Sequence, residues 1–193
     1  MDDPLVLCDA NVFYSILLTD LILSLSEAGL FRARWTNDIH EEWIRSLLQD
    51  QPQRKREDLE RRRQLMDEAI DHDLIEDYEQ HIQSLSLPDP DDRHVLAAAI
   101  EGGAEVILTY NLRDFPDAVL QAYGIEAMHP DEFLCEIMAD DPDLVLSVIE
   151  GMRTKRKRPE ISPSELLERL GRLSIAGFVK MLVSRRYADP KSL

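Results

Sequence analysis

The strongest constraint on this chain is the short run LVLCD at residues 5–9. Its first four residues are consecutive and apolar, so a strand built from them must be covered on both faces. Strands of that kind belong to parallel sheets, in which the crossover helices cover both sides. The run therefore predicts an α/β fold, and Asp9 falls at the carboxyl end of its first strand.

The following segments alternate between strand and helix patterns. Further strands are expected within residues 30–35, 105–111 and 125–130, and helices within residues 12–28, 36–48, 91–101 and 130–138. Residues 49–72 are strongly charged and predict an exposed helix with a narrow apolar stripe of Leu59, Leu65, Met66 and Ile70. Because strands alternate with helices, we expect a parallel sheet flanked by helices on both faces.

The charge of the chain divides it into two regions. The 193 residues carry a net charge of −16, but residues 151–193 hold 11 Lys and Arg against 4 Asp and Glu, a net charge of +7. The totals of 22 basic and 38 acidic residues leave 11 and 34 for residues 1–150, a net charge of −23. We expect an acidic body over residues 1–138 and an appended helical, basic region over residues 139–193, in which Ser162 or Ser164 caps a helix.

Composition also bears on the compartment. No apolar run approaches the roughly 18 residues of a membrane span, and the two aspartates after Met1 are unlike the basic start of a signal peptide. Cys8 and Cys135 are far apart and are expected as buried thiols. These features predict a soluble, cytoplasmic protein without membrane association.

The segment LPDPDDRHVLAAAI at residues 87–100 places an aspartate on the apolar side of a helix. Asp89 or Asp91 can cap this helix, and two glycines end it. The residues at i, i+3, i+4 and i+7 that form its apolar face are Asp92, Val95, Leu96 and Ala99. A buried carboxylate must be neutralised, paired or bound to metal. Asp92 is therefore either a metal ligand or a first-turn residue favoured by the helix dipole, and this helix alone does not decide between them.

Carboxylates from four separate segments are expected at one edge of the sheet. They are Asp9 after the first strand, Glu41 or Glu42 early in the second helix, Asp92, and Asp114 after the strand within 105–111. Taken singly, each has another explanation: a helix cap, a solvated helix charge or a turn residue. Together they would repel one another, and Mg²⁺ or Mn²⁺ would remove that conflict.

In their order these segments resemble the PIN-domain nucleases, in particular the VapC-type toxins of bacterial toxin–antitoxin pairs, over about residues 5–137. Four motifs carry the resemblance: LVLCDAN with Asp9 and Asn11, TNDIHEEW with Thr36, Glu42 and Trp43, DPDDRHVLAAAI with Asp92, and ILTYNLRDF with Thr109, Asn111, Asp114 and Phe115. The second motif favours Glu42 over Glu41. Residues 49–80 and 139–193 exceed a minimal PIN domain and resemble a larger subgroup with an extra C-terminal helical region.

The resemblance implies a metal-dependent endoribonuclease. Asp9, Glu42, Asp92 and Asp114 would be the catalytic metal ligands for Mg²⁺ or Mn²⁺, supported by Asn11, Thr109 and Asn111. Many relatives have aspartate in place of Asn111, which leaves open whether one or two ions bind. The resemblance further implies 5′-phosphate and 3′-hydroxyl products, a cognate antitoxin and a homodimer.

The basic run RTKRKR at residues 153–158 suggests how RNA could be attracted to an acidic protein. Lys155, Arg156, Lys157 and Arg158 are candidate RNA-binding residues, although a solvated linker, or pairing of the run with the acidic body or with a partner, would explain them equally well.

Two other functions remain in competition. One is a PIN-like scaffold that binds RNA without cutting it, against which the complete carboxylate set argues. The other is a phosphatase or phosphotransferase with an aspartate-rich pocket. That class requires a D-x-D start and a later lysine, whereas position 11 is asparagine and residues 64–154 contain no lysine.

Overall fold

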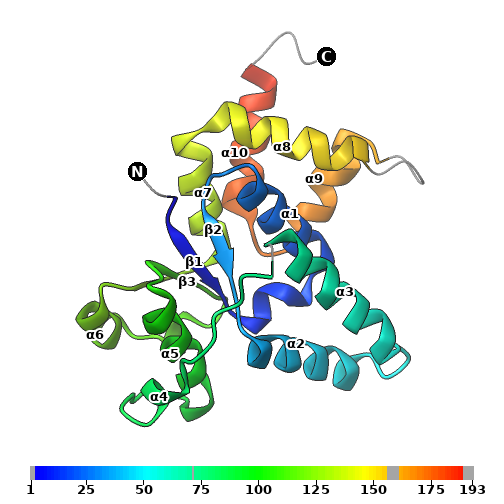
Figure 1. Ribbon diagram of the computed structural model, residues 1–193. Coiled ribbons are helices and arrows are strands. Elements are labelled where there is room, and N and C mark those ends of the chain that lie inside the picture. The colour runs from blue at the N-terminus through cyan, green and yellow to red at the C-terminus, as the bar shows by residue number, and fades with distance from the viewer. Residues whose placement is uncertain (1–2, 71, 156–160, 189–193) are drawn as a thin grey trace.

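The computed structural model describes residues 3–70, 72–155 and 161–188. Four short strands form a parallel sheet: β1 Leu5–Cys8, β2 Arg32–Arg34, β3 Val106–Leu108 and β4 Glu126–Met128. Their order is β2-β1-β3-β4, so β1 and β3 are central, and Leu7 of β1 pairs with Ile107 of β3. Figure 1 shows β1 and β2 side by side. Every residue of β1 is buried, as its continuous apolar pattern predicts. The expected parallel sheet flanked by helices is confirmed.

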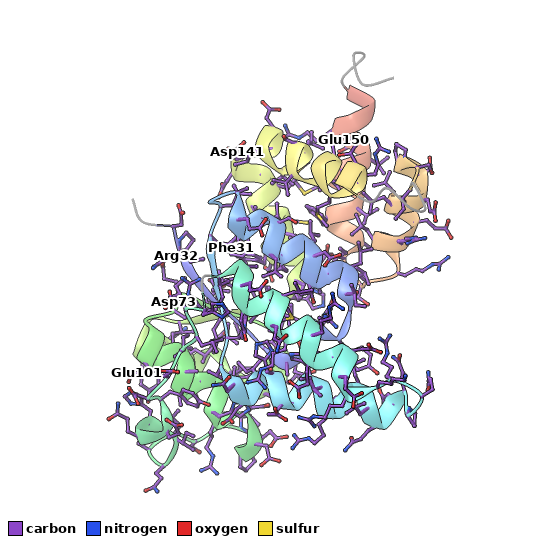
Figure 2. All side chains as sticks on the ribbon, turned by 45° about the vertical axis from the view of Figure 1, so that its right-hand side comes forward. Phe31, Arg32, Asp73, Glu101, Asp141 and Glu150 are labelled. Carbon is purple, nitrogen blue, oxygen red and sulfur yellow. The ribbon has the colours of Figure 1, made fainter. Side chains whose placement is uncertain are left out.

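Helices cover this sheet and extend beyond it. The helices of the body are α1 Ile16–Glu27, α2 Asn37–Asp50, α3 Arg56–Ala69, α4 Glu79–Ile82, α5 Arg93–Gly102, α6 Asp117–Leu120 and α7 Pro130–Asp140. Short 3₁₀ helices join them: η1 Ala10–Tyr14, η2 Pro90–Asp92, η3 Leu112–Asp114 and η4 Gln121–Tyr123. Helix α5 packs against the two central strands, and α1 packs against β2. Figure 2 shows Asp73 near the outer edge of the sheet, where it pairs with Arg34 of β2.

The first expected helix is interrupted, which corrects the prediction of one helix over residues 12–28. Residues 10–14 form η1, and α1 begins only at Ile16. Ser15 between them has an extended backbone, and its hydroxyl accepts a hydrogen bond from the Leu18 amide. The apolar period continues across this cap, so the period alone does not reveal the break.

Two expected burials are also wrong. Leu65, placed in the apolar stripe of the charged helix, is 59% exposed, whereas the other three stripe residues are buried. Cys135 is half-buried, while Cys8 is fully buried. The stripe of α3 is thus narrower than the sequence indicates.

A buried polar network attaches α3 to the body. Asp67 of α3 accepts hydrogen bonds from the Trp35 indole (3.0 Å) and from His40 Nε2 (2.7 Å). The indole N–H of Trp43 donates to His40 Nδ1 (2.9 Å), so the imidazole proton lies on Nε2 and points to Asp67. Burial lowers the pKa of His40, which keeps the ring neutral. All polar atoms of this contact are therefore paired.

The C-terminal region is helical, as expected. Its helices are α8 Pro142–Lys155, α9 Pro163–Gly171 and α10 Ala176–Ala188, and they lie together on one side of the sheet (Figure 1). Ser162 caps α9, with Pro163 in its first turn. Helix α8 packs against α1 and α10 against α7, and their buried apolar residues join the core of the body. The domain boundary between residues 138 and 139 stays a prediction. Arg156, Lys157 and Arg158 of the basic run lie outside the described residues.

Two contacts fasten this region to the body. The Asp131 carboxylate on α7 accepts the backbone N–H groups of Gly177 (3.0 Å) and Phe178 (2.8 Å), which belong to the first turn of α10. The Tyr110 hydroxyl donates to the carbonyl of Leu173 between α9 and α10 (2.8 Å). Among the helices that the structure describes, none is both long enough and apolar enough to pass through a membrane.

Asp131→Ala is expected to destabilise the protein by roughly 2 kcal/mol, because it removes a charged acceptor from two backbone donors at the start of α10. Urea unfolding measures the loss. Glu132→Ala is the matched control, since Glu132 lies exposed in the same first turn of α7. Equal losses in both variants would mean that the helix dipole, and not these hydrogen bonds, accounts for the effect.

Candidate active site

The Asp9 carboxylate joins the ends of the two central strands. It is 3% exposed and accepts hydrogen bonds from the Ala10 amide (2.6 Å), the Asn11 side chain (2.6 Å) and the Thr109 hydroxyl (2.7 Å). The Asn11 amide also donates to Thr109 Oγ1 (2.9 Å) and accepts from the Tyr110 backbone N–H (3.1 Å). Asn11 and Thr109 therefore hold Asp9 in one orientation at the carboxyl edge of the sheet.

The two candidate glutamates of α2 point to different partners. Thr36 caps this helix as predicted, because its hydroxyl accepts from the Ile39 amide (3.1 Å). Glu41 is exposed and pairs with Arg56 (2.6 Å) and Arg63 (3.0 Å) of α3. Glu42 lies instead 3.3 Å from Nε2 of His94, at the start of α5. Of the two glutamates, only Glu42 is turned toward the segment that carries Asp92.

Asp92 lies half-buried where η2 meets α5, and its side chain makes no capping hydrogen bond. Asp89 is the cap, accepting from the Asp91 amide (2.9 Å), and Gly103 ends α5 at a φ of 65°. Burial, followed by the charges of Asp9 and Asp114, raises the pKa of Asp92 to about 7. Asp92 thus occupies the N-cap position of α5 without making a capping hydrogen bond, and Asp89 caps η2 instead.

The pKa shifts of Asp9 and Asp92 indicate which of the candidate carboxylates lie near one another. Burial raises the pKa of Asp9 to about 6, partly offset by the Thr109 hydrogen bond, and the charge of Glu42 raises it further. The charges of Asp114 and Glu42 also act on Asp92. Asp114 itself is half-buried at the end of η3. All four sequence-predicted carboxylates thus come within electrostatic reach of one another.

Asn111 is placed differently from the four carboxylates. It is exposed, and its backbone N–H donates to Thr109 Oγ1 (3.0 Å). Of the three supporting residues predicted from the sequence, Asn11 and Thr109 take part in the hydrogen bonds around Asp9, whereas Asn111 is exposed and contacts Thr109 through its backbone.

The donor set suits a hard divalent cation, although the side chains are not gathered around one point. Within the described ranges, no three His, Cys, Asp or Glu residues lie close enough together to hold one ion. The donors are nevertheless carboxylate oxygens, which Mg²⁺ and Mn²⁺ prefer. Burial is the largest cause of the raised pKa values of Asp9 and Asp92, and the charges of the neighbouring carboxylates add to it, so a cation would relieve both effects.

Sequence reasoning missed His94. This residue lies in the first turn of α5, and its side chain is 17% exposed. Burial lowers the pKa of His94, but the contact with Glu42 and the charges of Glu42, Asp38 and Asp9 outweigh burial and raise it. Its Nδ1 is buried without a hydrogen-bond partner in the described part of the chain. The available signal was its position two residues after Asp92, in a segment already assigned to the site.

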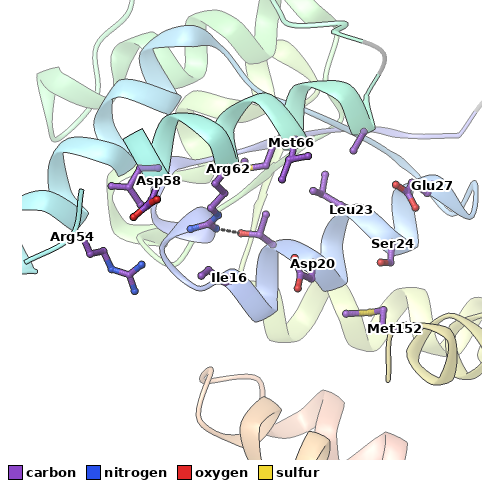
Figure 3. A pocket seen from close by; sticks show the side chains of 14 residues that line it. Ile16, Asp20, Leu23, Ser24, Glu27, Arg54, Asp58, Arg62, Met66 and Met152 are labelled. Atoms are coloured by element: carbon purple, nitrogen blue, oxygen red, sulfur yellow. Dashed lines mark hydrogen bonds between the residues drawn. The ribbon is translucent and has the colours of Figure 1, made fainter. Parts of the chain in front are cut away.

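A separate cavity lies away from the four candidate carboxylates. It has a volume of about 580 Å³ between α1 and α3, with Leu23 and Met66 on its walls and Arg62 extending across it (Figure 3). None of the four candidate carboxylates lines it. The acidic residues, and not the size of a cavity, therefore identify the candidate active site.

Asp92→Asn should stabilise the protein near pH 8 when no divalent ion is present. The folded-state pKa of Asp92, about 7, is above its ordinary value, so folding favours the protonated carboxyl and wild-type stability falls as the pH rises from about 4 through 7. An amide does not ionise and escapes this loss. Because water screens a half-buried group, the expected gain is about 1 kcal/mol.

Urea unfolding at about pH 8 and about pH 4 tests this expectation, and the difference between variant and wild type should vanish at the lower pH. A difference that is the same at both pH values would contradict the assigned environment of Asp92.

The comparisons with known proteins identify the family of the chain. The family described as "PIN domain" matches residues 5–113, and the family described as "VapC50 C-terminal domain" matches residues 130–184. A relative from Mycobacterium tuberculosis (strain ATCC 25618 / H37Rv), named "Putative ribonuclease VapC50", is 46% identical over 80 residues, which are 42% of this chain and 47% of that protein. The chain thus spans about half the length of the curated relative that it matches. No solved structure matches the chain. The chain belongs to the PIN-domain family, as a VapC-type member whose body continues into a VapC50 C-terminal domain.

Proposed function

We propose that this protein is a metal-dependent endoribonuclease and the toxin of a type II toxin–antitoxin pair. The observation that carries the proposal is that four carboxylates lie within electrostatic reach of one another near the carboxyl ends of the two central strands. Burial first, and then the charges of these neighbours, raises the pKa values of Asp9 and Asp92. The name of the Mycobacterium tuberculosis relative, which calls that protein a ribonuclease, supports the choice of RNA as substrate.

Asp9, Glu42, Asp92 and Asp114 are the residues that would hold Mg²⁺ or Mn²⁺. When bound, such an ion lowers the pKa of a coordinated water and offsets charge on the phosphate. Asn11 and Thr109 keep the Asp9 carboxylate ionised and oriented by donating hydrogen bonds to it. The ring of His94 on α5 orients Glu42 of α2 through the contact between Nε2 and the carboxylate. The exposed side chain of Asn111 is free to donate to a phosphate oxygen.

The contacts of Asn11 argue against a phosphatase. In a phosphatase, a second aspartate at this position would act on the substrate. Here the Asn11 side chain forms hydrogen bonds with Asp9, with Thr109 and with the backbone N–H of Tyr110. A scaffold that binds RNA without cutting it has no need for carboxylates that repel one another, and such repulsion costs stability. Hydrolysis of RNA therefore explains the site better than either alternative.

Other parts of the proposal concern partners and location. A cognate antitoxin, a homodimer and a cytoplasmic location follow from the VapC type and stay predictions. The contribution of Lys155, Arg156, Lys157 and Arg158 to RNA binding also stays a prediction. Arg153, at the start of the same run, pairs with Glu150 (2.5 Å) and donates to the Ile161 carbonyl (3.0 Å), so it serves the fold of the C-terminal region.

Asp92→Asn is expected to lower the rate of RNA cleavage at least about a hundredfold, because it removes one charged ligand from the proposed ion. A fluorescent single-stranded RNA cleaved in the presence of Mg²⁺ or Mn²⁺ gives the rate. Asp91→Asn is the matched control, since Asp91 is the adjacent, exposed aspartate. Near wild-type cleavage by the Asp92 variant, while its fold is retained, would refute the proposed active site.

Mn²⁺ should raise the melting temperature of the wild type, because binding to the folded state alone adds about 2.7 kcal/mol at a concentration of 100 times Kd. A variant with Asp9, Asp92 and Asp114 changed to Asn and Glu42 changed to Gln should show no such increase. Differential scanning calorimetry measures both proteins. The same increase in the two proteins would place the ion at some other site.

A further inference from the structure

Arg62 is a half-buried cation of the charged helix α3, and it contacts three other elements. Its Nη2 donates to the carbonyl of Phe13 in η1 and to the hydroxyl of Thr19 in α1, both at 2.6 Å. Its guanidinium carbon lies 4.8 Å from the centre of the Trp43 ring in α2. Figure 3 shows the side chain reaching from α3 across the cavity toward α1, with its hydrogen bond drawn as a dashed line.

Two of these contacts lead directly to proposed metal ligands. Phe13 belongs to η1, the single turn that starts after Asp9 and also carries Asn11. Trp43 is the residue after Glu42 in α2. Arg62 therefore contacts the C-terminal part of η1, which follows Asp9, and it also contacts Trp43, which follows Glu42. Arg62 touches neither carboxylate itself, so any effect on the site passes through η1 and α2.

Stability alone does not account for an arginine at this position. Burial lowers the pKa of Arg62 to about 10, although the charge of Asp20 acts in the opposite direction. Its Nη1 is buried with no hydrogen-bond partner among the described residues. Buried donors without partners are costly, and replacing buried ionic groups with apolar ones of similar size is often neutral or stabilising. A methionine would fill the same space without the unpaired Nη1, although the Phe13 carbonyl would lose its Arg62 donor.

We propose that Arg62 is a positioning residue that sets the separation between Asp9 and Glu42 by tying η1 to α2. The inserted helix α3 would then help to position the residues of the active site, although it supplies no metal ligand. This inference rests on the proposed metal site, but the arrangement of η1 can also be measured without any ion.

The first experiment compares Arg62→Met with Arg61→Met. The two changes are chemically identical, but Arg61 is exposed on the same helix. Isothermal titration calorimetry with Mn²⁺ gives the affinity, and urea unfolding gives the stability. Arg62→Met should weaken Mn²⁺ binding about tenfold or more relative to Arg61→Met under conditions in which urea unfolding shows that both variants are folded. Equal affinities in the two variants would overturn the proposal.

A packing variant separates positioning from general loosening of α3. Leu59→Ala removes a buried side chain of the same helix that makes none of the Arg62 contacts. It should lower stability and leave Mn²⁺ affinity near that of the wild type. If Leu59→Ala weakens Mn²⁺ binding as much as Arg62→Met, the effect belongs to the helix as a whole and the proposal fails. Should Arg62→Met not fold, Arg62→Lys, which keeps the charge but not the planar group over Trp43, takes its place.

The second readout needs no metal. The backbone N–H of Val12 donates to the Asp9 carbonyl (3.1 Å) and reports on the order of η1. Its hydrogen exchange, followed by NMR, should be at least about fivefold faster in Arg62→Met than in Arg61→Met. Unchanged exchange would contradict the role of Arg62. Absence of Mn²⁺ binding by the wild type would refute the metal site instead, and the exchange rate would then decide on Arg62 alone.

Discussion

The burial of the Asp9 carboxylate between the ends of β1 and β3 is the constraint around which this molecule is arranged. A carboxylate that is 3% exposed needs donors, and the chain supplies three within 2.7 Å. One of these comes from Thr109, 100 residues away in sequence, so the carboxylate can be satisfied only when both central strands are paired. The same pairing brings Asp92 and Glu42 toward it, at an electrostatic cost seen in the raised pKa values of both aspartates.

The parts outside the sheet are connected to this centre by single side chains. Just after β3, the Thr109 hydroxyl donates to Asp9, while the hydroxyl of the next residue, Tyr110, donates to the carbonyl of Leu173 in the C-terminal region. On the other side, Arg62 links α3 to η1 and α2. The C-terminal region and the inserted helix are therefore each connected, through one side chain, to segments that carry residues of the candidate active site.

Local rules account for what the sequence could predict. Continuous apolar runs indicated the strands, the cap at Thr36 and the left-handed Gly103 marked helix ends, and the helical spacing singled out Asp92. The preference for Glu42 over Glu41 came from the resemblance, and the ion pairs of Glu41 with α3 agree with it. The misses depend on long-range packing. The break at Ser15 falls within an unbroken apolar period, and the exposure of Leu65 depends on which face of α3 meets α1 and α2. The roles of His94 and Arg62 arise from partners that are distant in sequence.

The network around Asp67 has a consequence for spectroscopy. The chain contains two tryptophans, and both donate their indole N–H into this one network, Trp35 to Asp67 and Trp43 to His40. Trp43 also lies under the Arg62 guanidinium. The tryptophan fluorescence of the protein therefore originates beside the junction of α2 and α3. Its emission maximum is expected to report on the docking of the inserted helix.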